Sequence, residues 1–187
     1  MNSIWQMWSG ELNNETVASI IKECEYYTPK EAVVGQGETD EQVRKSTVRW
    51  INPYDVGSRF IHDLLWKYAT LANRSAFGVQ IDTIQDIQYT IYEGDENGHY
   101  NWHYDTFWAN QTMNDRKLSI TIQLSDPEDY EGGNFILDRQ YEQPNANALK
   151  TKGTILVFPS PIRHKVTPVT EGIRKSLVAW IEGPKWK

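Results

Sequence analysis

The segment from residue 100 to residue 107 contains a histidine and an aspartate two residues apart, His103 and Asp105. In an extended strand, side chains two apart project to the same face, so this pair would present an imidazole and a carboxylate together. His164 is the candidate for a third ligand, because no other histidine follows His103 and because it ends a second strand-like segment. Two histidines and one carboxylate leave several coordination positions open, which is typical of a non-heme Fe(II) centre.

A second pair with the same spacing, Arg174 and Ser176, lies on a strand predicted over residues 173–181. The arginine fork can bind a carboxylate through two parallel hydrogen bonds, and the serine adds a donor. The pair therefore predicts a carboxylate site. Taken alone, a His-x-Asp motif is a weak signal, because most buried histidines are satisfied by hydrogen bonds without a metal.

The order of these motifs resembles the Fe(II)- and 2-oxoglutarate-dependent oxygenases, in particular the prolyl 4-hydroxylase-like branch. Residues 118–133 and 164–172 are similar to the bacterial PKHD-type hydroxylases within that branch. The resemblance covers roughly residues 86–181, about half of the chain.

The resemblance implies a role for each of these residues. The resemblance implies that the ligands of Fe(II) are His103, Asp105 and His164. It also implies that Arg174 binds the distal carboxylate of 2-oxoglutarate, with Ser176, Tyr92 and Gln123 beside that carboxylate. It also implies O₂ as a cosubstrate, with ascorbate as a candidate reductant. The implied reaction is oxidative decarboxylation to succinate and CO₂, coupled to hydroxylation of a C–H bond.

The substrate that the resemblance suggests is a prolyl residue in a peptide or protein, with a free amino acid or another small molecule as the alternative. Four side chains would flank the metal, where rings could stack on a proline or pack the rim of a barrel: Tyr100, Trp102, Trp108 and Arg163. His62 and His99 are expected to lie outside the site, on the polar side of a helix and on a loop.

Alternation of apolar and polar residues predicts the strands that carry the site. In residues 86–92 the polar set is Gln88, Thr90 and Tyr92, and in residues 118–124 it is Ser119, Thr121 and Gln123. An antiparallel strand with one face in water would show the same pattern. Only the resemblance favours polar faces that look into a barrel.

The last two strand-like segments are predicted to form a hairpin. A three-residue loop, residues 170–172 with Gly172 left-handed, would pair residue 164 with residue 178. One face would then carry His164, Arg174, Ser176 and Trp180. The opposite face would pack under the helices with Leu177, Ala179 and Ile181.

The N-terminal third is expected to support this core. A first helix is predicted to extend to about residue 27, capped by Asn13 or Asn14. A second is predicted over residues 55–72, with a buried stripe of Phe60, Ile61, Leu64, Leu65, Tyr68 and Leu71. Strands are predicted near residues 4–8 and 46–51. Residues 31–46 are expected to form a connecting loop, with a mobile lid as the alternative, and residues 145–152 a second loop.

The expected fold is mainly β with flanking helices, a double-stranded β-helix of the jelly-roll, cupin-like type. We expect one domain over residues 1–187, with residues 1–80 as helical support and residues 81–187 as the catalytic β core.

The net charge of −6 argues against a nucleic-acid partner. No apolar run could cross a membrane and no secretory pattern is present, so a cytoplasmic monomer or small homo-oligomer is expected. The single cysteine, Cys24, is expected to be packed.

Two other classes of function remain open. A non-catalytic barrel that binds a sugar or another small molecule would have the fold without the iron triad. A cupin-like metalloenzyme that does not use 2-oxoglutarate would keep the metal but have no use for Arg174 and Ser176.

Overall fold

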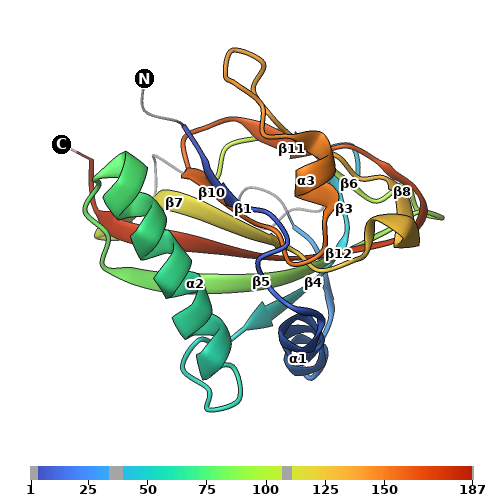
Figure 1. Ribbon diagram of the computed structural model, residues 1–187, viewed down its shortest axis with the longest axis horizontal. Coiled ribbons are helices and arrows are strands. Elements are labelled where there is room, and N and C mark those ends of the chain that lie inside the picture. The colour runs from blue at the N-terminus through green and yellow to red at the C-terminus, as the bar shows by residue number, and fades with distance from the viewer. Residues whose placement is uncertain (1–3, 34–39, 107–110, 187) are drawn as a thin grey trace.

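Two antiparallel sheets face each other in the computed structural model, which describes residues 4–33, 40–106 and 111–186 (Figure 1). In order across the larger sheet lie β1 (Gln6–Trp8), β10 (Ile155–Pro159), β7 (Asn114–Gln123), β12 (Val169–Pro184), β5 (Thr83–Glu93), β4 (Thr47–Ile51) and β2 (Lys30–Glu31), and β8 (Tyr130–Gly132) also pairs with β12. The smaller sheet consists of β3 (Arg44–Lys45), β6 (His99–His103), β11 (His164–Val166) and β9 (Phe135–Leu137). This arrangement confirms the predicted double-stranded β-helix with flanking helices.

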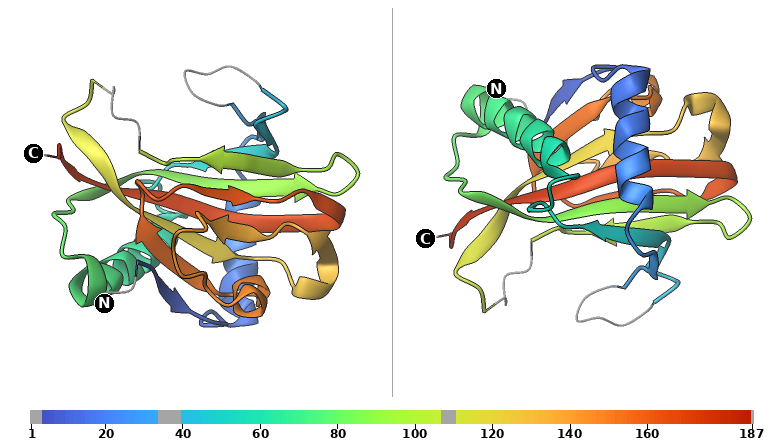
Figure 2. Two further views of the ribbon diagram at one scale, coloured as in Figure 1. Left: turned by 90° about the horizontal axis from the view of Figure 1, so that it is seen from above. Right: turned by 90° about the horizontal axis from the view of Figure 1, so that it is seen from below.

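Two helices, α1 (Asn14–Glu25) and α2 (Arg59–Ala72), lie across the outer face of the larger sheet, as the right-hand view of Figure 2 shows. Asn13 caps α1 by accepting a hydrogen bond from the backbone N–H of Thr16 (2.8 Å), as predicted. Cys24 is buried in the core, and burial is the main cause that raises its pKa to about 12. This thiol is therefore a packed apolar group, as predicted.

The second helix begins at Arg59, four residues later than predicted, because a turn precedes it. In that turn Ser58 Oγ donates to the carbonyl of Asn52, and the Asn52 side chain donates to Asp55 (2.8 Å). The buried stripe is also narrower than predicted, since Phe60 and Leu71 are each 41% exposed. The side chains of α2 that are buried against the sheet are Ile61, Leu65, Tyr68, Ala69 and Ala72.

Truncating α2 on its two sides tests this packing. Leu65→Ala is expected to lower the free energy of unfolding by about 2–5 kcal/mol, because Leu65 is fully buried and its loss leaves a cavity. The same truncation at Leu71, which is largely exposed, should change it by about 0.5 kcal/mol or less. Urea denaturation of the two variants measures the difference, and equal losses would contradict the assigned orientation of the helix.

The strand β12 separates the core from the cavity between the sheets. Its buried side chains alternate as predicted, with Leu177, Ala179 and Ile181 in the core beneath the helices. Its other face lines the cavity with Arg174, Ser176, Val178 and Trp180.

The predicted hairpin register is wrong. Residue 164 pairs with His103 and Leu137 in the smaller sheet, and residue 178 pairs with Gln88 and Thr121 in the larger one. Pro168, between β11 and β12, cannot donate a backbone N–H to a ladder, and the chain changes sheets there. His164 and Arg174 consequently face the same cavity from opposite sheets. Gly172 has the predicted left-handed backbone (φ 69°).

The N-terminal region contributes more than helical support. Besides α1 and α2, residues 1–80 supply β1 to β4; β3 lies within the segment predicted as a loop, and β2 ends at its first residue. Residues 34–39 of that segment lie outside the described residues, so the lid alternative stays a prediction. The segment predicted as a second loop contains a short helix, α3 (Ala146–Lys150), capped by Asn145. Within the described parts of the chain, no helix is long and apolar enough to span a bilayer.

Candidate active site

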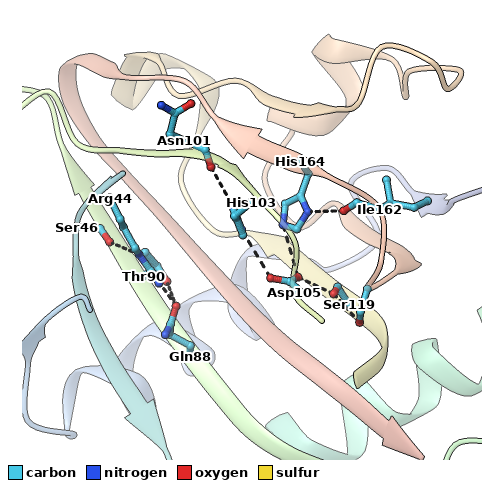
Figure 3. Close-up of polar contacts among 11 residues, drawn as sticks. Arg44, Ser46, Gln88, Thr90, Asn101, His103, Asp105, Ser119, Ile162 and His164 are labelled. Atoms are coloured by element: carbon cyan, nitrogen blue, oxygen red, sulfur yellow. Dashed lines mark hydrogen bonds and ion pairs between the residues drawn. The ribbon is translucent and has the colours of Figure 1, made fainter. Parts of the chain in front are cut away.

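The structure brings His103, Asp105 and His164 together. His103 and His164 are directly paired across β6 and β11, and Asp105 follows the end of β6. One ligand atom from each residue lies within 4.8 Å of those of the other two. Asp105 Oδ1 lies 3.6 Å from Nε2 of His103, and Asp105 Oδ2 lies 3.5 Å from Nε2 of His164 (Figure 3). Three donor atoms thus converge on one point inside the barrel.

Hydrogen bonds to the other atoms of these side chains fix their orientation. Nδ1 of His103 donates to the carbonyl of Asn101 (2.8 Å), and Nδ1 of His164 donates to the carbonyl of Ile162 (2.9 Å). In the neutral form of either ring these hydrogen bonds place the proton on Nδ1 and leave Nε2 free on the side of Asp105, which is the tautomer that a metal requires. Asp105 Oδ2 accepts a hydrogen bond from Ser119 Oγ (2.6 Å). The donor set and its outer hydrogen bonds fit a divalent metal such as Fe(II).

The surroundings of His103 and Asp105 favour the protonation states that bind a metal. Burial, followed by the nearby His164, lowers the pKa of His103 to about 3, so its imidazole is neutral at pH 7. Burial alone would raise the pKa of Asp105, but His164, His103 and the hydrogen bond from Ser119 outweigh it and lower that pKa. A neutral imidazole and a charged carboxylate are the forms that coordinate metals.

The hydroxyl of Ser119 provides a test of how the carboxylate is oriented. Ser119→Ala is expected to weaken metal binding by about 10- to 100-fold, since outer hydrogen bonds position a ligand and tune its basicity. Titration with Mn(II), followed by calorimetry, measures the affinity. Ser19→Ala, on the exposed part of α1, is the matched control and should leave it unchanged.

A planar stack supports His103. The ring of Tyr100 lies parallel to the imidazole, with centroids 3.4 Å apart and planes inclined by 8°. The guanidinium of Arg44 lies over the same tyrosine ring, 4.4 Å from its centroid. Because an imidazole at 3.4 Å leaves no room on its own face, the guanidinium covers the other face. Tyr100 lines the cavity, but its two faces are occupied by protein groups.

Two of the other side chains predicted to flank the metal, Trp102 and Arg163, lie outside the cavity lining. Trp102 stands beside Arg163 and Lys165, whose charged ends lie 5.3 Å and 4.9 Å from its ring centroid. Neither Trp102 nor Arg163 is among the described residues that line the cavity. Trp108 falls outside the described residues. His62 lies on α2 beside Asp63, and His99 is the first residue of β6 rather than part of a loop as predicted.

The residues predicted to hold 2-oxoglutarate divide into two groups. Arg174, Ser176 and Tyr92 line the cavity, with Nη1 of Arg174 3.5 Å from Ser176 Oγ and its guanidinium 5.5 Å from the Tyr92 ring centroid. Gln123 lies behind them, where its side chain donates to the hydroxyl of Tyr130 (3.1 Å). Arg174 is only 5% exposed and forms no ion pair with the described residues.

A buried arginine without a counter-charge fits a site for an anionic ligand. Nε of Arg174 is buried without a hydrogen-bond partner among the described residues. Gly133 makes room for this side chain, since a Cβ at that position would lie 2.8 Å from Arg174 Cδ. These observations fit the distal carboxylate of 2-oxoglutarate.

Two polar residues that were not predicted from the sequence are Arg44, which lines this cavity, and Tyr130, which lies beside it. Tyr130 lines a smaller hollow next to Arg174, and no local pattern distinguishes it from other tyrosines of the chain. Arg44 comes from β3, inside the segment predicted as a loop, so its strand was not recognised and its direction could not be inferred. A lone arginine in a polar segment carries no sequence signal of burial.

A family model for the 2OG-Fe(II) oxygenase superfamily matches residues 87–182, so the chain belongs to this family. Membership implies Fe(II), 2-oxoglutarate and O₂ as cofactors, and the triad described above fits the metal. The resemblance drawn from the sequence motifs is thereby confirmed.

Within this superfamily, the chain is similar in sequence to PKHD-type hydroxylases. The chain is 36% identical over 96 residues to a PKHD-type hydroxylase of Synechococcus sp. (strain CC9311) and 34% identical over 96 residues to one of Colwellia psychrerythraea. These matches cover 51% and 50% of this chain but only 41% and 42% of those relatives, so less than half of their length is represented.

Solved structures show the same fold over nearly the whole chain. A prolyl-4-hydroxylase of Pseudomonas putida superposes with a TM-score of 0.74 at 20% identity, over 97% of this chain and 94% of that one. A prolyl hydroxylase of Trichoplax adhaerens, solved with a peptide fragment of hypoxia inducible factor, also gives 0.74 at 15% identity, over 96% of this chain and 83% of that one.

Proposed function

We propose that this chain is a 2-oxoglutarate-dependent dioxygenase that hydroxylates a C–H bond, with His103, Asp105 and His164 as its iron ligands. One observation carries the proposal: the Nε2 atoms of both histidines lie within 3.6 Å of Asp105, inside a cavity that is also lined by Arg174, which forms no ion pair with the described residues. In this proposal residues 81–187 form the catalytic core and residues 1–80 complete its sheets and cover them.

The residues described above have separate roles in the proposed reaction. Arg174, with Ser176 and Tyr92 beside it, holds the far carboxylate of 2-oxoglutarate and so fixes which end can reach the metal. Ser119 orients Asp105, and the carbonyls of Asn101 and Ile162 orient the two histidines. Phe135, Phe158 and Val166 line the cavity and exclude water. When bound, iron, 2-oxoglutarate and O₂ together supply the oxidising power.

The prolyl residue suggested by the sequence remains one candidate substrate, supported by the solved neighbours that are prolyl hydroxylases. A free amino acid or another small molecule is the second candidate. It is favoured by the stack at Tyr100, whose faces are covered by His103 and Arg44 and so cannot receive a proline ring.

Anaerobic titration with Fe(II) and 2-oxoglutarate tests the class of enzyme. The proposed function requires a visible charge-transfer band and, once O₂ is added, formation of succinate. A non-catalytic barrel would show neither, and a cupin-like metalloenzyme would bind Fe(II) without the band. A panel of proline-containing peptides and free amino acids, scored by mass gain of one oxygen, then addresses the substrate.

A further inference from the structure

A second buried arginine, Arg44, lines the cavity and lies across the Tyr100 ring from the metal ligand His103. Figure 3 shows Arg44 with Ser46, Gln88 and Thr90 on one side of β12, and His103, Asp105 and His164 on the other. Arg44 is 7% exposed, donates from Nε to Ser46 Oγ (3.0 Å) and from Nη2 to Gln88 Oε1 (2.7 Å). A guanidinium carries five N–H donors, so these two bonds leave donors available to a ligand in the cavity.

Arg44 has no negatively charged partner among the residues that the structure describes. None of the ion pairs formed between described residues includes it, and its contacts are a hydroxyl, an amide oxygen and the Tyr100 ring. Removing a guanidinium from water is unfavourable unless an anion compensates it. The same reasoning connects Arg174 with the carboxylate of 2-oxoglutarate, and it calls for a second anion at Arg44.

The two arginines serve different ends of the cavity. Arg174 is level with Tyr92 on β5, whereas Arg44 contacts Gln88 on that strand, four residues away or about 13 Å along the sheet. The cavity therefore contains two separate positive charges, each of which can bind one anionic group.

A second orphaned donor marks the Arg44 end. Trp180 lines the same cavity and is 6% exposed, yet its indole Nε1 is buried without a hydrogen-bond partner among the described residues. Its strand neighbour Val178 pairs with Gln88, the residue that Arg44 contacts. Trp50, which also pairs with Gln88, lies 6.1 Å from Trp180 between ring centroids and is 40% exposed. This part of the cavity therefore combines an aromatic side chain, the indole N–H of Trp180 and the positive charge of Arg44.

We propose that Arg44 binds a carboxylate of the substrate, so that the enzyme selects substrates with an anionic group near the carbon that it hydroxylates. This inference rests on the proposed function and specifies its substrate class. The carboxylate has two possible sources, the α-carboxylate of a free amino acid or the side chain of Asp or Glu next to the target residue in a peptide. Trp180 Nε1 supplies a further donor at this end of the cavity.

Matched acids and amides test the proposal. The protein, loaded with Mn(II) and the unreactive analogue N-oxalylglycine, is titrated calorimetrically with the free L-amino acids and with their carboxamides. A parallel series uses N-acetyl-prolyl dipeptide amides that carry Asp or Glu, against the same peptides with Asn or Gln. We expect the acid of at least one pair to bind about 10-fold or more tightly than its amide, as charge-assisted hydrogen bonds do. Which series shows the preference identifies the source of the carboxylate.

Variants separate recognition from folding. Arg44→Gln should abolish the preference for acid over amide, Arg44→Lys should retain part of it, and Arg59→Gln, on the exposed side of α2, should leave it unchanged. A preference that survives in Arg44→Gln, a preference for the amides, or no binding by any acid at millimolar concentration overturns the proposal. The charge-transfer band with Fe(II) and 2-oxoglutarate is recorded for every variant. If that band is absent from the wild-type protein, the proposed function fails; if it is present without acid selectivity, only this inference fails.

Discussion

Replacing Asp105 with alanine is expected to weaken Fe(II) binding by more than about 100-fold and to abolish 2-oxoglutarate turnover, since loss of a ligand exceeds the effect of losing an outer hydrogen bond. Asp105 is the only carboxylate in the described cluster and the centre toward which both Nε2 atoms point. The dissociation constant comes from anaerobic calorimetry, and turnover from succinate release.

A second variant separates the lost charge from an altered shape. Asp105→Asn keeps the size of the side chain and an oxygen that can accept from Ser119, but removes the negative charge, so it should lose turnover as Asp105→Ala does. Asp63→Ala, on the exposed side of α2, is the control and should retain both metal binding and turnover. Full activity of Asp105→Asn would contradict the role of this carboxylate as an iron ligand.

Replacing Arg174 with methionine is expected to raise the dissociation constant for 2-oxoglutarate by about 10- to 100-fold, the value of hydrogen bonds to a charged group. Methionine preserves much of the apolar length of the side chain, so packing against Gly133 and Tyr92 changes little. Iron binding should remain intact, because Arg174 contacts none of the three metal ligands. Fluorescence or calorimetric titration with 2-oxoglutarate measures the effect.

The neighbouring residue provides a matched control. Lys175 alternates to the other face of β12, where it forms an ion pair with Glu25 on α1 (3.0 Å). Lys175→Met removes a positive charge one residue away on the same strand, and should leave the affinity for 2-oxoglutarate within about twofold, because exposed ion pairs contribute little. If both variants lose affinity equally, the effect is one of general charge and the assigned site is wrong.

Much of the local structure was predictable because it depends on short-range patterns. Alternation along β12 placed Leu177 in the core and Ser176 in the cavity, and an asparagine before an apolar stripe placed the start of α1. The wrong hairpin register has the opposite origin. Whether β11 pairs with β12 or with β6 depends on partners more than 60 residues away, and no pattern within the hairpin distinguishes the two.

The sequence determined the order of the motifs that contain His103, Asp105, His164 and Arg174, and through it the resemblance to the family. It also determined which neighbouring side chains share a face, because the two-residue period of strands is a property of the chain alone. The tertiary structure decided what those residues surround. It placed His164 and Arg174 on opposite sheets, closed both faces of Tyr100, and brought Arg44 from a polar N-terminal segment into the cavity. Burial of that arginine depends on the packing of two sheets against each other. Its need for a compensating anion therefore arises only in the folded molecule and cannot be inferred from the sequence.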